Sequence, residues 1–244
     1  MSGFIHGFQE SRRAKRLDRA AKMLRQKTAT EEQRRVAYEE IENNPGAEAA
    51  EALLNRYDFT IEKTIADLEE KEWIHDLLIG WGEVVVEPVK AYLRRAAQIA
   101  WPVKILAALI PREELLEFLF LLMPEGDTIF DENSHQRAIE VLAQLGEFRD
   151  PRISHLAAGL LGDSDDDLKL AALAAIELQA GDEEREAVTA AFLAEEDNIR
   201  VRKRMLELFH AKGWSVESIR KEAEKLLPQG YFLSKNHVIK QRDY

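Results

Sequence analysis

The sequence predicts an all-α protein, an α-solenoid of about six stacked helix pairs that ends in a short β-hairpin or an irregular tail. Three observations predict this fold. Apolar residues follow helical spacing through most of the 244 residues, a pattern of 33 to 34 residues recurs in the second half, and glycine (12) and proline (7) are sparse and stand between the periodic segments. One helix pair cannot bury its apolar face alone, whereas stacked pairs share a continuous core.

The pattern divides the chain into three parts. We expect a basic N-terminal helix or cap over 1–30, the solenoid over 31–227, and a tail or hairpin over 228–244. The helix pairs are predicted at about 33–57, 60–97, 98–124, 134–161, 167–194 and 200–227. In the last part, the segments Tyr231–Leu233 and Val238–Lys240 are the two candidate strands.

Prolines and acidic residues mark the expected helix ends. A proline suits the first helical turn because its missing N–H would have no partner there, and this holds for Pro88, Pro102, Pro111 and Pro151. Asp150 is a good N-cap for the helix that begins at Pro151, while Thr30–Gln33 and Ser164–Asp167 have the spacing of capping boxes. Three further prolines fall where helices should stop: Pro45, Pro124 and Pro228.

The repeat is clearest when three segments are superposed, Ser134–Ala138, Leu168–Ala172 and Val201–Met205. The apolar positions then coincide at offsets of 34 and 33 residues, in the sets Ala138, Ala172 and Met205; Val141, Ala175 and Leu208; Leu142, Ile176 and Phe209. The second helices carry a comparable set at an offset of 32 residues, with Leu156, Leu160 and Leu161 matching Val188, Phe192 and Leu193. These positions should form the core between consecutive pairs.

The turns of the repeat carry an acidic residue, then an apolar and a basic residue, then a Leu-rich helix, best seen in Asp165–Lys169 and Asp197–Arg202. This arrangement resembles the HEAT repeat. The whole chain is similar to small bacterial HEAT-repeat proteins, including the HEAT-like class named after phycobilisome lyases, most closely over 134–227 and more loosely over 33–124. The resemblance implies an armadillo-like α-solenoid that holds other macromolecules, and it implies no catalytic residues because the HEAT motif is structural.

Charge is segregated along the chain, whose formal net charge is −11. The net charge is +6 over 1–27, −6 over 28–112, −17 over 113–197 and +6 over 198–244. A potential of this size steers charged partners and is sensitive to salt. The acidic middle either forms a surface that takes a basic protein segment or is a solvated face that keeps the protein soluble. In both cases it argues against a chain that binds nucleic acid over its whole surface.

The N-terminal segment carries eight basic residues around a narrow apolar stripe, Leu17, Ala20 and Leu24. Such a helix either caps the open end of the first helix pair or lies on anionic lipid or phosphate groups. In the capping arrangement its arginines face solvent or pair with acids such as Glu39 and Glu40. Four of them are candidate partner-binding residues: Arg12, Arg13, Arg16 and Arg19.

A second group of candidate partner-binding residues consists of Arg200, Arg202, Lys203 and Arg204. These basic residues either bind a phosphate or form hydrogen bonds and ion pairs between repeats. The resemblance favours the second alternative, because basic residues at this position of HEAT repeats tend to link neighbouring repeats.

Most candidate chemistry fails on residue type or spacing. The absence of cysteine excludes disulfides, Cys-ligated zinc, iron–sulfur clusters and thiol catalysis. Asp163, Asp165 and Asp167 resemble the start of a calcium loop, but Leu168 and Ala174 stand where an EF-hand needs glycine and glutamate. The histidines are scattered, and no phosphate-binding glycine loop occurs. The four tryptophans are expected to pack in the core rather than to form a stacking surface.

These features predict a non-catalytic scaffold or adaptor for protein–protein interactions in the cytoplasm, with a basic protein partner and no cofactor or metal. No segment has the order of a secretory signal, and the apolar stretch Ile99–Met123 is broken by charges and prolines. Two alternatives remain. One is an enzyme on a HEAT scaffold, lyase- or DNA-glycosylase-like by resemblance, and the other is an adaptor tethered to anionic membrane or nucleic acid by its N-terminal helix.

Overall fold

The protein is described from a computed structural model that covers 2–62, 64–124, 132–195, 198–227 and 229–242, with side chains of the first helix from Arg12 onward. These residues are mostly helical and contain one two-stranded sheet, which confirms the all-α class. None of the helices in the described ranges is both long and apolar enough to cross a bilayer. The chain divides into two compact units, Met1–Leu122 and Met123–Tyr244. The predicted limits of the N-terminal cap and the C-terminal part stay predictions.

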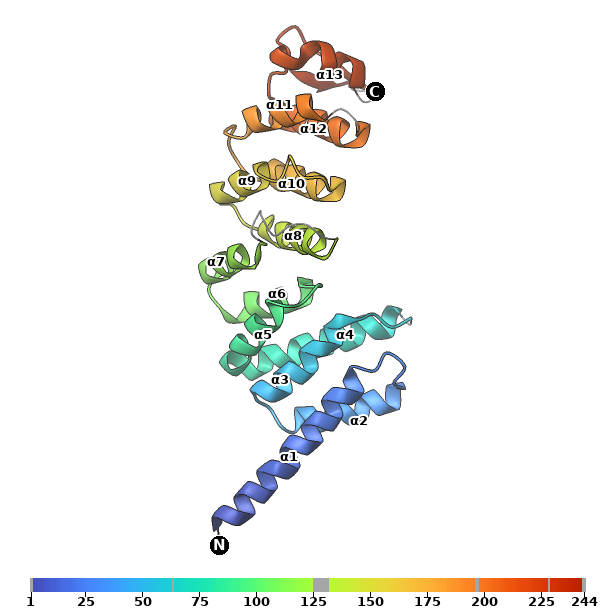
Figure 1. Ribbon diagram of the computed structural model, residues 1–244, viewed down its shortest axis with the longest axis vertical. Coiled ribbons are helices and arrows are strands. Elements are labelled where there is room, and N and C mark those ends of the chain that lie inside the picture. The colour runs from blue at the N-terminus through green and yellow to red at the C-terminus, as the bar shows by residue number, and fades with distance from the viewer. Residues whose placement is uncertain (1, 63, 125–131, 196–197, 228, 243–244) are drawn as a thin grey trace. The chain divides into compact units, whose positions relative to one another are not determined.

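The first unit consists of helices and short 3-10 turns in the order predicted from the pairs (Figure 1). Its elements are α1 (Ser2–Leu24), α2 (Glu31–Glu42), α3 (Ala47–Leu54), η1 (Asn55–Asp58), α4 (Thr64–Trp81), η2 (Gly82–Val85), α5 (Val86–Leu93), α6 (Ala100–Leu109) and α7 (Arg112–Leu122). Helix α3 lies centrally and packs against α1, α2, α4 and α5. It is short and rich in alanine, and Ala49, Ala50 and Ala52 are buried with Leu53 and Leu54, so neighbouring helices approach its backbone closely.

A buried ion cluster holds α4 against α2 and η1. The side chain of Arg56 in η1 is fully buried, and it donates hydrogen bonds to Asp67 (2.6 Å), to Glu70 (2.8 Å) and to the Phe59 carbonyl (3.0 Å). Arg34 of α2 donates to the second oxygen of Glu70 at 2.8 Å. A buried guanidinium is tolerated only where its N–H groups find acceptors, and here two carboxylates of α4 and a backbone carbonyl supply them.

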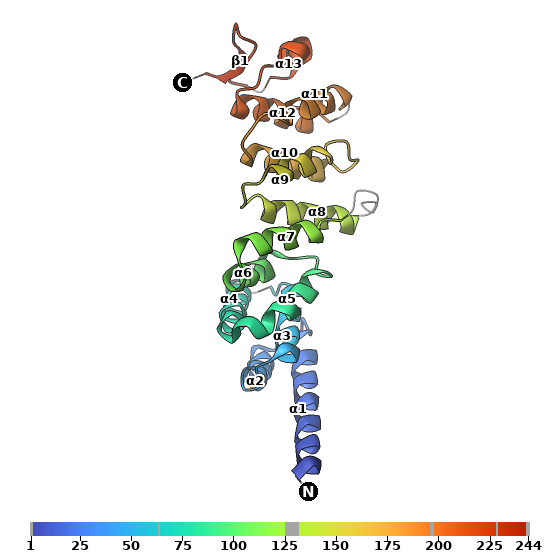
Figure 2. The same cartoon turned by 90° about the vertical axis from the view of Figure 1, so that its left-hand side faces the viewer.

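The second unit has six helices, a 3-10 turn and a hairpin in its described residues. They are α8 (Glu132–Leu145), α9 (Pro151–Ala158), α10 (Asp166–Leu178), α11 (Arg185–Ala194), α12 (Ile199–Lys212), η4 (Glu217–Ile219), α13 (Arg220–Leu226), β1 (Tyr231–Leu233) and β2 (Ile239–Gln241). The first helices of the three pairs are neighbours, because α10 packs against both α8 and α12, as Figures 1 and 2 also show for this unit.

The superposed repeat positions form the core of this unit. Ala138, Ala172 and Met205 are all fully buried, and so are the next two sets of the alignment, with at most 3% of any side chain exposed. The match between the second helices is partly wrong, because Leu193 is 52% exposed while Val188 and Phe192 are buried. Helix α9 also ends at Ala158, so Leu160 and Leu161 reach the core from the following turn.

Two of the three N-terminal caps predicted from the sequence are confirmed. Thr30 and Gln33 form the expected capping box of α2, and Asp150 caps α9 by accepting from the Arg152 N–H at 2.9 Å. The capping box at Ser164 is wrong, since α10 begins one residue later and Asp165 accepts from the Leu168 N–H at 2.8 Å. Pro228 lies outside the described residues.

Polar side chains join the turns of successive helix pairs in the second unit. The buried amide of Gln179, at the end of α10, accepts from the Asp150 N–H at 3.0 Å and donates to the Phe148 carbonyl at 3.1 Å. The carbonyl of Gln179 in turn accepts from Lys212, at the end of α12. The partners are 29 to 33 residues apart, so each bond connects one repeat to the next.

The C-terminal hairpin is present and pairs Tyr231 with Gln241 and Leu233 with Ile239 in antiparallel register. Its second strand is shifted by one residue from the predicted Val238–Lys240. The turn of the hairpin contains His237 at a φ of 58°. The His237 carbonyl accepts a hydrogen bond from the Val216 N–H at 2.8 Å, and Ile239 is buried against α12.

Replacing Arg56 by methionine should lower the free energy of unfolding by about 3–5 kcal/mol, because Asp67 and Glu70 then keep buried charge without its main partner. Urea unfolding followed by circular dichroism measures this loss. Arg35→Met is the matched control, since Arg35 pairs with Glu32 and Glu39 on the exposed face of the same region. Equal midpoints for the two variants would contradict the structural role of the cluster.

Gln179→Ala should destabilise the second unit by about 1–3 kcal/mol, because it leaves the Asp150 N–H without its partner in a buried turn and removes one of the two donors to the Phe148 carbonyl. The fluorescence of the buried Trp214 reports unfolding of this unit. Gln144→Ala, in α8, is the control because its amide makes no hydrogen bond to the described residues. A change in Gln179→Ala no larger than in the control would show that the turn bonds do not contribute.

Candidate functional site

The basic residues of α1 lie around a stripe that is already covered. Leu17, Ala20 and Leu24 are buried, and the helix packs against α2 and α3. Arg13 donates to the Pro45 carbonyl at 3.2 Å, and Arg16 lies 3.6 Å from Glu40, one of the two acids named from the sequence. The apolar stripe is thus used inside the unit, as a cap requires, and is not free to enter a lipid surface.

Two of the four α1 candidates border a shallow hollow between α1 and α2. Arg16 and Arg19 line it together with Met23, Val36 and Glu40, and its volume is about 240 Å³. The exposed Arg19 forms no ion pair with the described residues, whereas Arg12 has a partner of its own. The structure therefore brings together only part of this predicted group.

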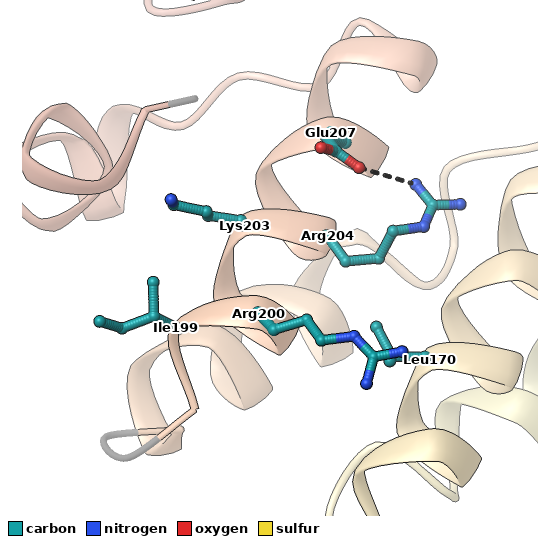
Figure 3. Close-up of a pocket in the computed structure, with 6 residues that line it drawn as sticks. All are labelled: Leu170, Ile199, Arg200, Lys203, Arg204 and Glu207. Atoms are coloured by element: carbon teal, nitrogen blue, oxygen red, sulfur yellow. Dashed lines mark ion pairs between the residues drawn. The ribbon is translucent and has the colours of Figure 1, made fainter. Parts of the chain in front are cut away.

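The basic cluster of α12 borders a larger hollow on the side where α12 meets α10 (Figure 3). Arg200, Lys203 and Arg204 line it with the apolar side chains of Leu170 and Ile199, and its volume is about 630 Å³. Figure 3 shows Arg200 and Arg204 extending toward α10, while Lys203 points away from them. The fourth candidate, Arg202, is not part of this hollow and lies over the ring of Phe192 at 4.6 Å.

Two of the four basic residues in this cluster pair with acids of the neighbouring helix pair. Arg200 lies 3.3 Å from Asp167, and Arg204 pairs with Glu177 of α10 and lies 3.9 Å from Glu207. Both α10 acids belong to the preceding repeat, so these pairs link α10 to α12. Arg200 and Arg204 therefore make the connection between repeats that the resemblance favours, whereas Lys203 forms no ion pair with the described residues.

A third surface was not predicted and lies between α2 and α4. It is a hollow of about 260 Å³, hereafter the α2–α4 notch, lined by Glu31, Arg35 and Tyr38 of α2 and by Ala66, Glu69, Glu70 and Trp73 of α4. The rings of Tyr38 and Trp73 form its apolar wall, with their centroids 4.9 Å apart and their planes tilted by 56°. Tyr38 is buried, whereas Trp73 is only half-buried and keeps part of its ring open to solvent.

The buried ion cluster fixes the floor of this notch. The Tyr38 hydroxyl donates to Glu70 at 3.1 Å, and the same carboxylate accepts from Arg34 and Arg56. Burial raises the pKa of the Tyr38 phenol, and the charge of Glu70 raises it further, so the phenol stays protonated and acts as a donor. Lys71, one residue after Glu70, is held at 2.8 Å from Asp67.

The prediction that all four tryptophans pack in the core is wrong for three of them. Only Trp214 is fully buried, with its indole N–H donating to Asp182 at 2.6 Å. Trp73, Trp81 and Trp101 are half-buried. In the sequence, the notch is indicated only by Trp73 and the acid one turn before it, Glu69. Helical spacing alone does not distinguish such an aromatic from one that packs in the core.

The histidines and acids that were candidate metal ligands have other contacts in the part of the chain that the structure describes. No three histidine or acidic side chains there converge as a metal site would require. His135 of α8 lies 3.1 Å from Asp163, and His210 of α12 contacts the carbonyl of Ile239 in β2 at 2.8 Å. The side chain of Asp165 caps α10, as expected for a helix start rather than a calcium loop.

The carboxyl of Asp67 makes the stability of the first unit dependent on pH. Burial by itself raises the pKa of Asp67, but hydrogen bonds from Lys71 and Arg56 outweigh it, so the pKa is lowered. Because the pKa of Asp67 is lower in the folded state than in the unfolded state, where it is about 4, ionised Asp67 stabilises the fold above pH 4. This stability is lost as the pH falls from there through the folded-state pKa. Asp67→Asn should therefore destabilise the protein most at pH 6, and less at pH 3.

Urea unfolding of both proteins at several pH values measures this difference, and Glu72→Gln, an exposed acid of the same helix, is the control. A gap between wild type and Asp67→Asn that stays constant with pH would contradict the lowered pKa.

Comparison of this chain with models of protein families, with curated proteins and with solved structures gave no match. The function therefore has to be inferred from the surfaces described above.

Proposed function

We propose that the protein is a non-catalytic scaffold that binds a basic segment of a protein partner on an acidic α-solenoid surface. In this proposal all six helix pairs continue one HEAT-like stack, as the repeat pattern predicts. The chain binds no cofactor in this role and uses side chains on preformed helices, so little conformational entropy is lost on association.

One observation carries the proposal: the acidic turn over 182–186 keeps its charge. Four of its five residues are acids, and none of the five forms an ion pair with the described residues. Asp182 accepts from Trp214 and Glu184 accepts from Ser154, whereas Glu183 and Glu186 have no partner among the described residues. Other acids of this unit, such as Asp166 and Glu195, are paired with Lys169.

This contrast separates acids that build the unit from acids that remain available. A fixed group of unpaired carboxylates attracts a basic segment and speeds its association, and this attraction weakens as salt increases. An acidic surface that served solubility alone would need no such difference between neighbouring turns.

The proposal is tested by affinity capture from an extract of the source organism, with the full chain as bait at low and at raised salt. The expected result is a set of partners with basic segments that elute when salt is raised, and that bind the purified chain in a calorimetric titration. The variant Glu183→Gln/Glu186→Gln should retain less of each partner, because it removes two unpaired charges without touching a structural contact. Partners that are not basic, or that stay bound at high salt, would contradict the proposal.

A further inference from the structure

The α2–α4 notch combines an aromatic wall with two carboxylates, Glu31 and Glu69, that form no ion pair with the described residues. Its wall is formed by Tyr38 and by the half-buried ring of Trp73. The face of an indole ring attracts a cation by its quadrupole, and the attraction is strongest for tryptophan. The wall therefore favours a positively charged group that also has apolar atoms to bury.

The charges at the rim of the notch point to the same class of ligand. Glu70 is occupied by Arg34, Arg56 and Tyr38, and Arg35 is occupied by Glu32 and Glu39. Glu31 and Glu69 are exposed and form neither an ion pair nor a hydrogen bond with the described residues. The available charge of the notch is therefore negative.

Local structure accounts for only one of these two acids. Glu31 is the first residue of α2, where the helix dipole favours a carboxylate. Glu69 lies in the middle of α4, one turn before Trp73 and one turn after Ile65, which is 76% exposed. This ridge of α4 therefore presents an exposed isoleucine, an unpaired carboxylate and the open part of an indole ring that is covered on one side by Tyr38.

The size of the notch limits what it can hold. At about 260 Å³ it is smaller than the hollows that enclose a drug-sized ligand or cofactor, which measure about 300–1,000 Å³. A single long side chain with an apolar stem and a cationic end fits this description, and lysine and arginine are the two natural side chains of that kind.

We infer that the α2–α4 notch is a binding site for one lysine or arginine side chain of a basic protein segment, with Trp73 and Tyr38 against its stem and cation, and with Glu31 and Glu69 as its counter-charges. This inference rests on the proposed function and gives it a defined anchor. The ion cluster beneath the notch holds the phenol and the α4 backbone in place before the partner arrives, so the site is preorganised.

The test uses the full chain and a fluorescein-labelled dodecapeptide in which lysine and arginine alternate with glycine and serine. Glu31→Gln/Glu69→Gln should weaken its binding roughly tenfold in an anisotropy titration, because two charge-assisted contacts are lost. Trp73→Leu should weaken it about three- to tenfold, while Trp73→Phe, which keeps an aromatic face, should lose less.

The control variant Glu51→Gln/Glu83→Gln removes the same net charge from two other exposed acids of the first unit. It should change the affinity by less than about twofold, since it alters only the long-range field. A peptide with acetylated lysines and with citrulline in place of arginine should not bind.

An independent readout comes from the indole N–H signals in a nitrogen–proton correlation spectrum. The Trp73 signal, assigned with Trp73→Phe, should shift on adding the peptide, while that of Trp101, whose ring already carries Lys104 at 4.7 Å from its centroid, should not. Equal weakening in the Glu51/Glu83 control, or an unmoved Trp73 signal, would overturn the notch and leave the acidic scaffold standing. A wild-type chain that binds no basic peptide, but still captures salt-labile basic partners from the extract, would also overturn the notch alone.

Discussion

Both units depend on one constraint: when helix pairs pack together, the turns between them become interior, and their polar groups must find partners other than water. A buried N–H or carbonyl without a partner costs about 1–3 kcal/mol, a large share of the stability of a small domain. In the first unit Arg56 meets this requirement by binding the Phe59 carbonyl and two acids of α4. In the second unit Gln179 meets it by bonding to the turn of the preceding pair and to Lys212 of the next.

The same constraint divides the charges of this acidic chain into two kinds. Acids at the start of α10 are used in structure, since Asp165 caps the helix, Asp166 pairs with Lys169 of the same helix, and Asp167 pairs with Arg200 of α12. The Asp167–Arg200 pair joins α10 to α12, and acids that are used in this way add little free charge. The functional argument therefore rests on the acids that remain, at 182–186 and beside Trp73, and not on the total of −17 over 113–197.

Helical spacing and turn residues were enough to predict the helix pairs and much of the core. Ala138, Ala172 and Met205 occupy the same position of the repeat, and helical spacing alone predicts that this position is buried. The buried state of Arg56 could not be predicted, because an arginine between helices is usually solvated and only the acids 11 and 14 residues later make burial possible. The notch was missed for a related reason, since Tyr38 and Trp73 are 35 residues apart and each fits a core position in its own helix.

A single notch of this kind contributes limited affinity, because one exposed cation–π contact and two screened carboxylates are each worth about 1 kcal/mol or less. Useful affinity then requires that a partner meets several such sites on one chain, so that each later contact forms at high effective concentration. A stack of helix pairs suits this mode of binding, since every repeat adds surface without changing its neighbours. In the proposed function, selectivity then comes from the spacing of cations along the partner rather than from one deep pocket.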